Sequence, residues 1–143
     1  MKIEEQVLSR EQMKYLQELG VDTSDASMAY YNISRDNQPD KWVLGIANKE
    51  VASIMFSNGI REMKPAYTTG DLFRKLPSSL KCDYLNSCIA IHTDGCDEPL
   101  ISASYEFEYN NTKGKQVGDT IEEALYNLLC WVAINRKELL GIK

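Results

Sequence analysis

The chain has 143 residues, of which 43% are hydrophobic and 26% charged, and its formal net charge is −5 at pH 7. This length suits one domain, and the balance of apolar and charged residues excludes a disordered chain. Apolar runs are far too short for a membrane span, and the first five residues carry two acids and no apolar signal segment. We therefore expect a single globular domain over residues 1–143, cytoplasmic and without a membrane partner.

Basic side chains form no dense cluster in the sequence. The richest stretches are the pairs Arg74–Lys75 and Arg136–Lys137, which stand at the ends of predicted helices and complement the helix dipole there. Most of the affinity for duplex nucleic acid comes from Lys and Arg side chains that neutralise its phosphates. The acidic net charge of this chain therefore disfavours nucleic acid as a partner. A small basic groove remains compatible with this composition.

Residues 9–19 carry the start, face and end signals of a helix. Ser9, followed three residues later by Gln12, matches a capping box. Gly20 suits the left-handed position after a helix, and Val21 can contact the last turn. We expect this helix to end at Leu19.

Two strands are expected at residues 27–33 and 41–46, because the loop between them is rich in Asp, Asn and Pro. Residues 51–56 are apolar and fit either a strand or a short helix, since so short a run shows no decisive period. Alternation places three side chains on one face of the second strand: Trp42, Leu44 and Ile46.

A short helix, capped by Thr68 or Thr69 and ended by Pro77, precedes a predicted β-hairpin of residues 84–92 and 100–109. The second strand of this hairpin alternates strictly, which indicates one buried and one solvated face. The expected buried face comprises Ile101, Ala103, Tyr105, Phe107 and Tyr109, and the expected solvated face comprises Ser102, Ser104, Glu106 and Glu108.

A polar turn at residues 110–115 is expected to lead into a long helix, opened by a capping pair of Asp119 and Glu122. The core-facing stripe of this helix comprises Ile121, Ala124, Leu125, Leu128, Leu129 and Val132. Three more apolar residues lie on its flank or back: Cys130, Trp131 and Ile134. Such a helix is either buried between two layers or uses these three residues as an interface with a second copy or another protein.

Four residues with zinc-binding chemistry fall in one segment: Cys82, Cys88, His92 and Cys96. They include no Cys-x-x-Cys pair, and on a strand Cys88 and His92 would stand about 13 Å apart at roughly 3.3 Å per residue. One zinc ion cannot reach both. Nothing indicates an oxidising compartment, so we expect free thiols, no metal and no cofactor.

His92 is the only histidine, so any reaction that requires imidazole must use it. With Cys96 it could form a thiolate–imidazole pair, and these two residues are the candidates for catalysis. Glu106 and Glu108 have a spacing comparable to glycosidase carboxylates, but alternating acids are also typical of an exposed strand face. Common nucleotide, hydrolase and zinc-protease motifs are absent from the sequence.

Three stretches of the chain, residues 8–28, 65–77 and 123–131, show a resemblance in sequence and order. They are similar to a family of small uncharacterised proteins from Bacteroides-type gut bacteria and their mobile elements and prophages. The resemblance implies a bacterial cytoplasmic origin. It implies no catalytic residue.

These patterns predict an α+β fold, with an antiparallel sheet of about four to five strands and the N- and C-terminal helices packed on one face. The function we expect is a small non-catalytic binding or protein-interaction module with a homo-oligomer or protein partner. One alternative is a small enzyme that uses His92 with a nearby Cys or Asp. The other is a nucleic-acid-associated accessory protein of a mobile element.

Overall fold

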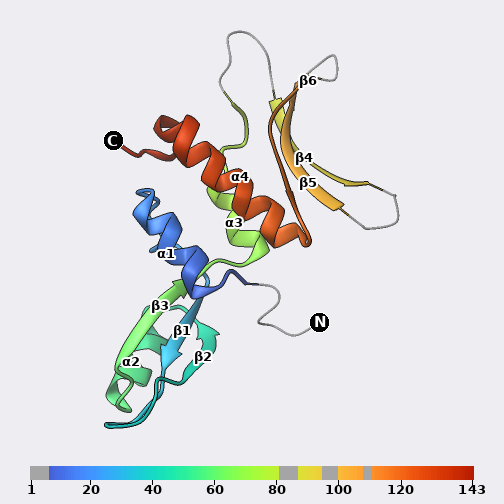
Figure 1. Ribbon diagram of the computed structural model, residues 1–143. Helices are drawn as coiled ribbons and strands as arrows, with labels where there is room; N and C mark the ends of the chain where they lie inside the picture. Colours follow the sequence, from blue (N-terminus) through green and yellow to red (C-terminus); the bar gives the residue numbers. More distant parts are fainter. Residues whose placement is uncertain (1–6, 81–86, 95–99, 108–110) are drawn as a thin grey trace.

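The computed structural model describes residues 7–80, 87–94, 100–107 and 111–143. Within these ranges the chain forms four α-helices and two three-stranded antiparallel sheets, so the predicted α+β class is confirmed. The prediction of a single sheet of four to five strands is wrong. The two sheets lie at opposite ends of the molecule with helices between them, so the strands of one sheet do not reach those of the other (Figure 1).

The first sheet has the strand order β2-β1-β3 and is antiparallel throughout. β1 (Met28–Asn32) and β2 (Trp42–Ile46) are the two predicted strands, each slightly shorter than expected. β3 (Glu62–Ala66) is not expected from the sequence, because Pro65 argues against a central strand. The structure places β3 at the sheet edge, where proline is tolerated.

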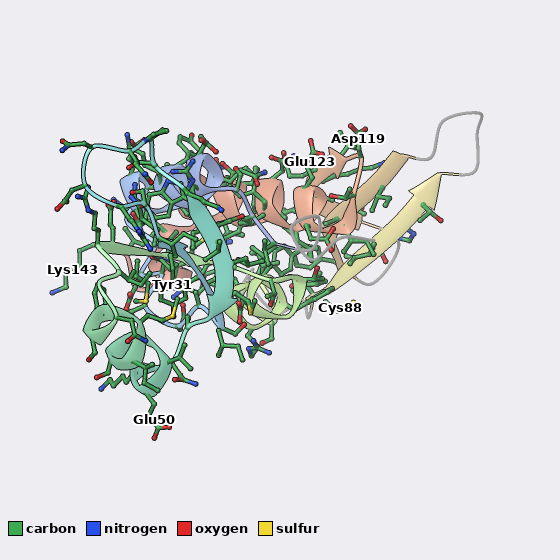
Figure 2. All side chains as sticks on the ribbon, turned by 90° about the horizontal axis from the view of Figure 1, so that it is seen from below. Tyr31, Glu50, Cys88, Asp119, Glu123 and Lys143 are labelled. Carbon is green, nitrogen blue, oxygen red and sulfur yellow. The ribbon has the colours of Figure 1, made fainter. Side chains whose placement is uncertain are left out.

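The ambiguous apolar segment after β2 is a helix, α2 (Lys49–Ser57). Asn48 caps this helix by accepting a hydrogen bond from Val51 N at 2.7 Å. None of the residues of α2 is buried, and Glu50 points away from the rest of the molecule (Figure 2). α2 therefore contributes little to the core.

The second sheet has the order β4-β5-β6 and is also antiparallel. β4 (Ser87–Asp94) and β5 (Leu100–Phe107) form the predicted hairpin. The polar turn predicted at residues 110–115 is wrong, because residues 111–118 form a third strand, β6 (Asn111–Gly118). An edge strand that pairs only with β5 needs little apolar character, so periodicity could not indicate it.

The central strand β5 has a buried inner face, as predicted, but its outer face is less solvated than expected. Ser102 and Ser104 are each only 2% exposed. Small side chains on a central strand are covered by larger cross-strand neighbours, and His92 and Val117 flank Ser102 in the ladder. The inner-face residues are buried or half-buried, namely Ile101, Ala103, Tyr105 and Phe107, and Tyr109 lies outside the described residues.

Three helices, α1 (Arg10–Glu18), α3 (Thr69–Lys75) and α4 (Ile121–Asn135), lie between the two sheets (Figure 1). α4 packs on β5 and β6, whereas α1 lies beside β3, so the two terminal helices do not share one sheet face as predicted. The main core joins side chains of all three helices to the inner face of β5. A 3-10 turn (Lys137–Leu140) follows α4. No helix in the described ranges has the length and apolar character needed to cross a membrane.

Both ends of α1 agree with the prediction. Ser9 and Gln12 form a reciprocal capping box, with bonds of 3.2 and 2.9 Å. Gly20 has a φ of +94°, and Val21 N donates to Leu16 O at 3.0 Å. This bond closes the helix end with the geometry expected around a left-handed glycine.

The cap of α4 differs from the prediction by one residue. Thr120, not Asp119, is the N-cap, and its hydroxyl accepts from Glu123 N at 3.1 Å. The Glu123 carboxylate in turn accepts from Asp119 N at 3.2 Å, and both acids lie at the start of α4 (Figure 2). The predicted partner Glu122 instead accepts a hydrogen bond from Thr69 Oγ1 at 2.5 Å.

Candidate functional site

The catalytic candidate His92 lies beside a carboxylate on the outer face of the β4–β5 hairpin. His92 Nε2 contacts Glu106 Oε1 across the small pair Ala90 and Ser104, which separates the two residues in the ladder. The His92 side chain is 55% exposed, and it lines neither of the two grooves described below. Cys96, its expected thiol partner, lies outside the described residues. A catalytic role for His92 therefore stays a prediction.

The two cysteines that the structure describes are both free thiols. Cys88 is exposed on β4, and Cys130 is buried in α4. Burial raises the pKa of the Cys130 thiol to about 11, although a hydrogen bond with Tyr126 acts in the opposite direction. No group of three or more metal-binding side chains occurs among the described residues. Cys82 and Glu108 lie outside them.

The three apolar residues predicted as an interface on α4 differ in their exposure. Cys130 is buried, and Trp131 is half-buried, packed against the core and against Gly114. Only Ile134 is well exposed, at 58%. Most of the extra apolar surface of α4 is therefore covered from within the chain.

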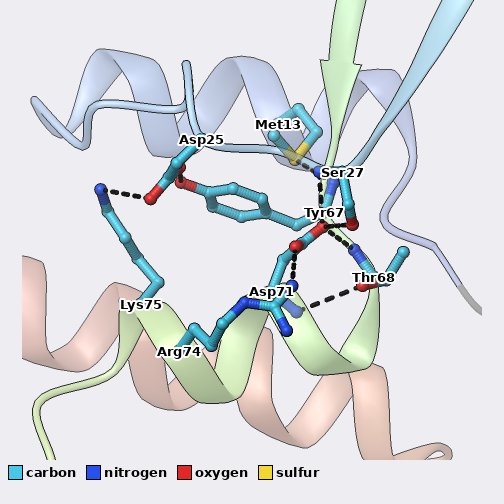
Figure 3. Close-up of polar contacts among 8 residues, drawn as sticks. All are labelled: Met13, Asp25, Ser27, Tyr67, Thr68, Asp71, Arg74 and Lys75. Atoms are coloured by element: carbon cyan, nitrogen blue, oxygen red, sulfur yellow. Dashed lines mark hydrogen bonds and ion pairs between the residues drawn. The ribbon is translucent and has the colours of Figure 1, made fainter. Parts of the chain in front are cut away.

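A buried carboxylate fixes β1 against the start of α3 (Figure 3). Asp71 is 3% exposed, and its Oδ2 accepts hydrogen bonds from Ser27 N at 3.0 Å, Ser27 Oγ at 2.6 Å and Thr68 N at 3.0 Å. Arg74 donates to the other oxygen, Oδ1. Desolvation alone would raise the pKa of Asp71, but these hydrogen bonds to the charged form outweigh it and the pKa is lowered. Asp71 thus caps α3 and tethers it to the first sheet.

Tyr67 extends this network from the end of β3 to α1. Its side chain is fully buried, and its hydroxyl lies 2.6 Å from Asp25 Oδ1 and 2.9 Å from the Asp22 carbonyl oxygen. Lys75 binds the other oxygen of Asp25 at 3.3 Å, and Tyr67 N donates to Met13 Sδ at 3.3 Å (Figure 3). Burial, with Asp25 beside the hydroxyl, raises the pKa of Tyr67. This hydrogen-bonded network links α1, β3 and α3 to one another.

A groove of about 510 Å³ lies between α1 and β3, whose relative positions the network sets. This volume is within the range of ligand sites, roughly 300–1,000 Å³. Part of its lining is apolar, contributed by Met13, Met63 and Pro65. The charged lining is mostly basic and consists of Arg10, Lys14 and Lys64, with Glu11 as the acid.

The cations of this groove have few acidic partners. Among the described residues, Arg10 and Lys14 form no ion pair, and Lys64 Nζ lies 3.8 Å from a Glu62 oxygen. The Arg10 guanidinium and Lys64 Nζ lie 4.6 and 5.3 Å from the centre of the Trp42 ring, within cation–π range. Arg10 and Lys14 lie one turn apart on α1, and like charges at this spacing weaken a helix. Their presence is therefore not explained by the stability of the helix.

A second groove, of about 420 Å³, flanks the opposite side of β3. It shares Met63 and Pro65 with the first groove, and its other apolar walls are Ala26, Ala47 and Ala52. The edge of β3 therefore separates a basic groove from a more apolar one, and both can contact one ligand laid along that edge.

None of these groove residues is identified as a site from the sequence, although one signal could have pointed to part of it. The spacing of Arg10 and Lys14 places them one turn apart on a predicted helix, which is a readable signal. Lys64 and Trp42 belong to strands whose pairing the sequence does not fix, and β3 itself is not expected. Their approach to α1 depends on tertiary structure.

Comparison with protein-family models, with curated proteins and with solved structures found no match. The resemblance to small proteins of gut bacteria and their mobile elements therefore stays a prediction.

Proposed function

We propose that this chain is a small non-catalytic protein-interaction module, and that the groove between α1 and β3 receives an acidic segment of a partner protein. The observation that carries the proposal is the meeting of three cations with methionine and proline surface in one groove. The chain as a whole has a net charge of −5, so a local basic groove attracts anions against the overall field. Methionine side chains adapt to varied apolar groups.

A nucleic acid fits this groove less well than an acidic peptide does. The Arg10 and Lys64 cations lie over the Trp42 ring. A base that stacked on this ring, as in single-strand binding, would have to displace them. Three cations in an acidic chain also neutralise few phosphates. The apolar lining gives a peptide a further source of affinity.

The test is a titration with a fluorescein-labelled hexapeptide of alternating Val and Glu, followed by fluorescence polarisation. Lys14→Glu replaces attraction by repulsion in the groove, and we expect binding about tenfold weaker, corresponding to roughly 1–2 kcal/mol for one reversed pair. Raising the salt concentration should weaken wild-type binding, because exposed charges are screened.

Lys115→Glu is the matched control, since Lys115 is also exposed, lies on β6 and changes the net charge equally. This variant should bind the peptide as the wild type does. An equal loss in both variants would attribute binding to net charge and refute the groove. Tighter binding of a six-residue deoxythymidine oligonucleotide than of the peptide would replace the proposal by the nucleic-acid alternative.

A further inference from the structure

The hydrogen-bond ladder of the first sheet determines which backbone groups of β3 face outward. Ile33 N donates to Lys41 O at 2.8 Å, in register with the β1–β2 pairs. Antiparallel strands alternate between bonded and non-bonded pairs, so the odd-numbered residues of β1 bond to β2 and the even-numbered ones bond to β3. The residues of β3 opposite odd-numbered partners are Met63 and Pro65, and their backbone groups point to the free edge.

The next outward-facing residue, Tyr67, shows that this edge accepts an added segment. Its carbonyl oxygen accepts a hydrogen bond from Leu8 N at 2.9 Å, and Val7 forms an isolated antiparallel bridge with Thr68. Further along the edge, in the part of the chain that the structure describes, no hydrogen bond engages Met63 N–H or the outward carbonyl oxygens of Met63 and Pro65. Three backbone groups are thus available to a ligand.

The side chains at this edge differ between the two faces of the sheet. Met63 and Pro65 share a face with the second groove, whose walls are apolar apart from polar residues that include Asp22 and Lys49. Lys64 points to the other face, toward the Trp42 ring. In an added strand, each residue places its side chain on the same face as the residue opposite it. A segment laid along β3 therefore meets apolar, basic and apolar surroundings in turn.

We propose that the acidic segment binds as an extra strand on the free edge of β3, with an acidic residue opposite Lys64 and apolar residues opposite Met63 and Pro65. This inference rests on the proposed function and specifies its binding mode, in which main-chain bonds give affinity and alternate side chains give selectivity. Because Pro65 has no N–H, the edge offers one donor and two acceptors. With only these three backbone groups to bond, the added strand of the partner is short.

The experiment compares N-methylated forms of the alternating Val and Glu hexapeptide by fluorescence polarisation with the wild-type chain. One peptide carries N-methyl groups on every Val and the other on every Glu. An added strand turns only one of these two sets of N–H groups toward β3. We expect the peptide methylated on that set, the Val positions opposite Met63 and Pro65, to bind about fivefold to tenfold more weakly per blocked bond.

Methylation of the Glu positions should leave binding close to that of the parent peptide. Saturation with the parent peptide should also slow hydrogen exchange of the Met63 amide, measured by NMR, more than that of the Lys64 amide. Equal effects of the two methylated peptides, or an unprotected Met63 amide at saturation, would overturn the added-strand mode while leaving the groove as the binding site. Failure of the parent peptide to bind at all would instead refute the proposed function.

Discussion

Replacing Gly114 by alanine tests how α4 is seated on the second sheet. Gly114 has a φ of +71° and lies where the β5–β6 ladder shifts register, as in a bulge with a left-handed glycine. A Cβ atom at this position would lie 2.7 Å from Trp131 Cε3 and 2.9 Å from its Cδ2. The left-handed backbone should lower the free energy of unfolding by about 1–2 kcal/mol, and overpacking against Trp131 by about 1–3 kcal/mol. The expected total loss of stability is roughly 2–5 kcal/mol.

Gly141→Ala separates these two contributions. Gly141 has a similar φ of +73°, and nothing lies within 4 Å of its added Cβ. This variant should therefore lose only the backbone part, about 1–2 kcal/mol. A third measurement introduces Gly114→Ala into a Trp131→Leu background, where the smaller side chain should reduce the cost of the alanine toward the Gly141 value.

The assay is urea unfolding followed by far-ultraviolet circular dichroism, with the free energy of unfolding extrapolated to water. The m-values of the variants should match that of the wild type, which shows that only stability has changed. If Gly114→Ala costs no more than Gly141→Ala, the Trp131 contact does not constrain this strand. The account of Trp131 as an internally packed residue would then be refuted.

Two further predictions concern the buried groups. Asp71→Asn should cost about 2–4 kcal/mol, since it removes charge-assisted hydrogen bonds from a buried site. The pKa of Asp71 is lowered in the folded state, so its stabilisation is present above the unfolded pKa of about 3.9 and is lost as the pH falls through the folded value. Urea unfolding should therefore show a steeper acid loss in the wild type than in the variant, and parallel curves would contradict this. In the folded protein at pH 8, iodoacetamide should modify Cys88 and spare Cys130, whose pKa is about 11; site-resolved mass spectrometry with comparable labelling of both would contradict the burial.

The proposed peptide site lies directly beside the buried network that holds α1, β3 and α3. The network around Asp71 and Tyr67 is fully hydrogen-bonded, since no buried side-chain N or O atom of the described residues lacks a partner. The adjoining edge of β3 has outward backbone groups without a partner among the described residues, and of the cations beside it only Lys64 has an acidic neighbour there, Glu62. The network and the groove thus adjoin each other and share Met13, which accepts a hydrogen bond from Tyr67 N and lines the groove.

Local signals in the sequence determined several elements by themselves. The Ser9–Gln12 capping box and Gly20 define both ends of α1. The apolar stripe of α4 correctly predicts five buried residues, but Ile121, also placed in that stripe, is 39% exposed because it lies at the first position of the helix. Strict alternation along residues 101–107 likewise predicts a strand with one core-facing side. These signals suffice because they involve interactions within about four residues, or a repeat that a single element shows on its own.

The tertiary structure alone decided which strands pair and where the groove lies. β3 and β6 carry no clear period because most of their side chains are exposed, so no apolar alternation marks them in the sequence. The meeting of Arg10 with Trp42, and of Ser27 with Asp71, joins residues far apart in the chain. Such contacts depend on the packing of whole elements, which no short window of sequence specifies.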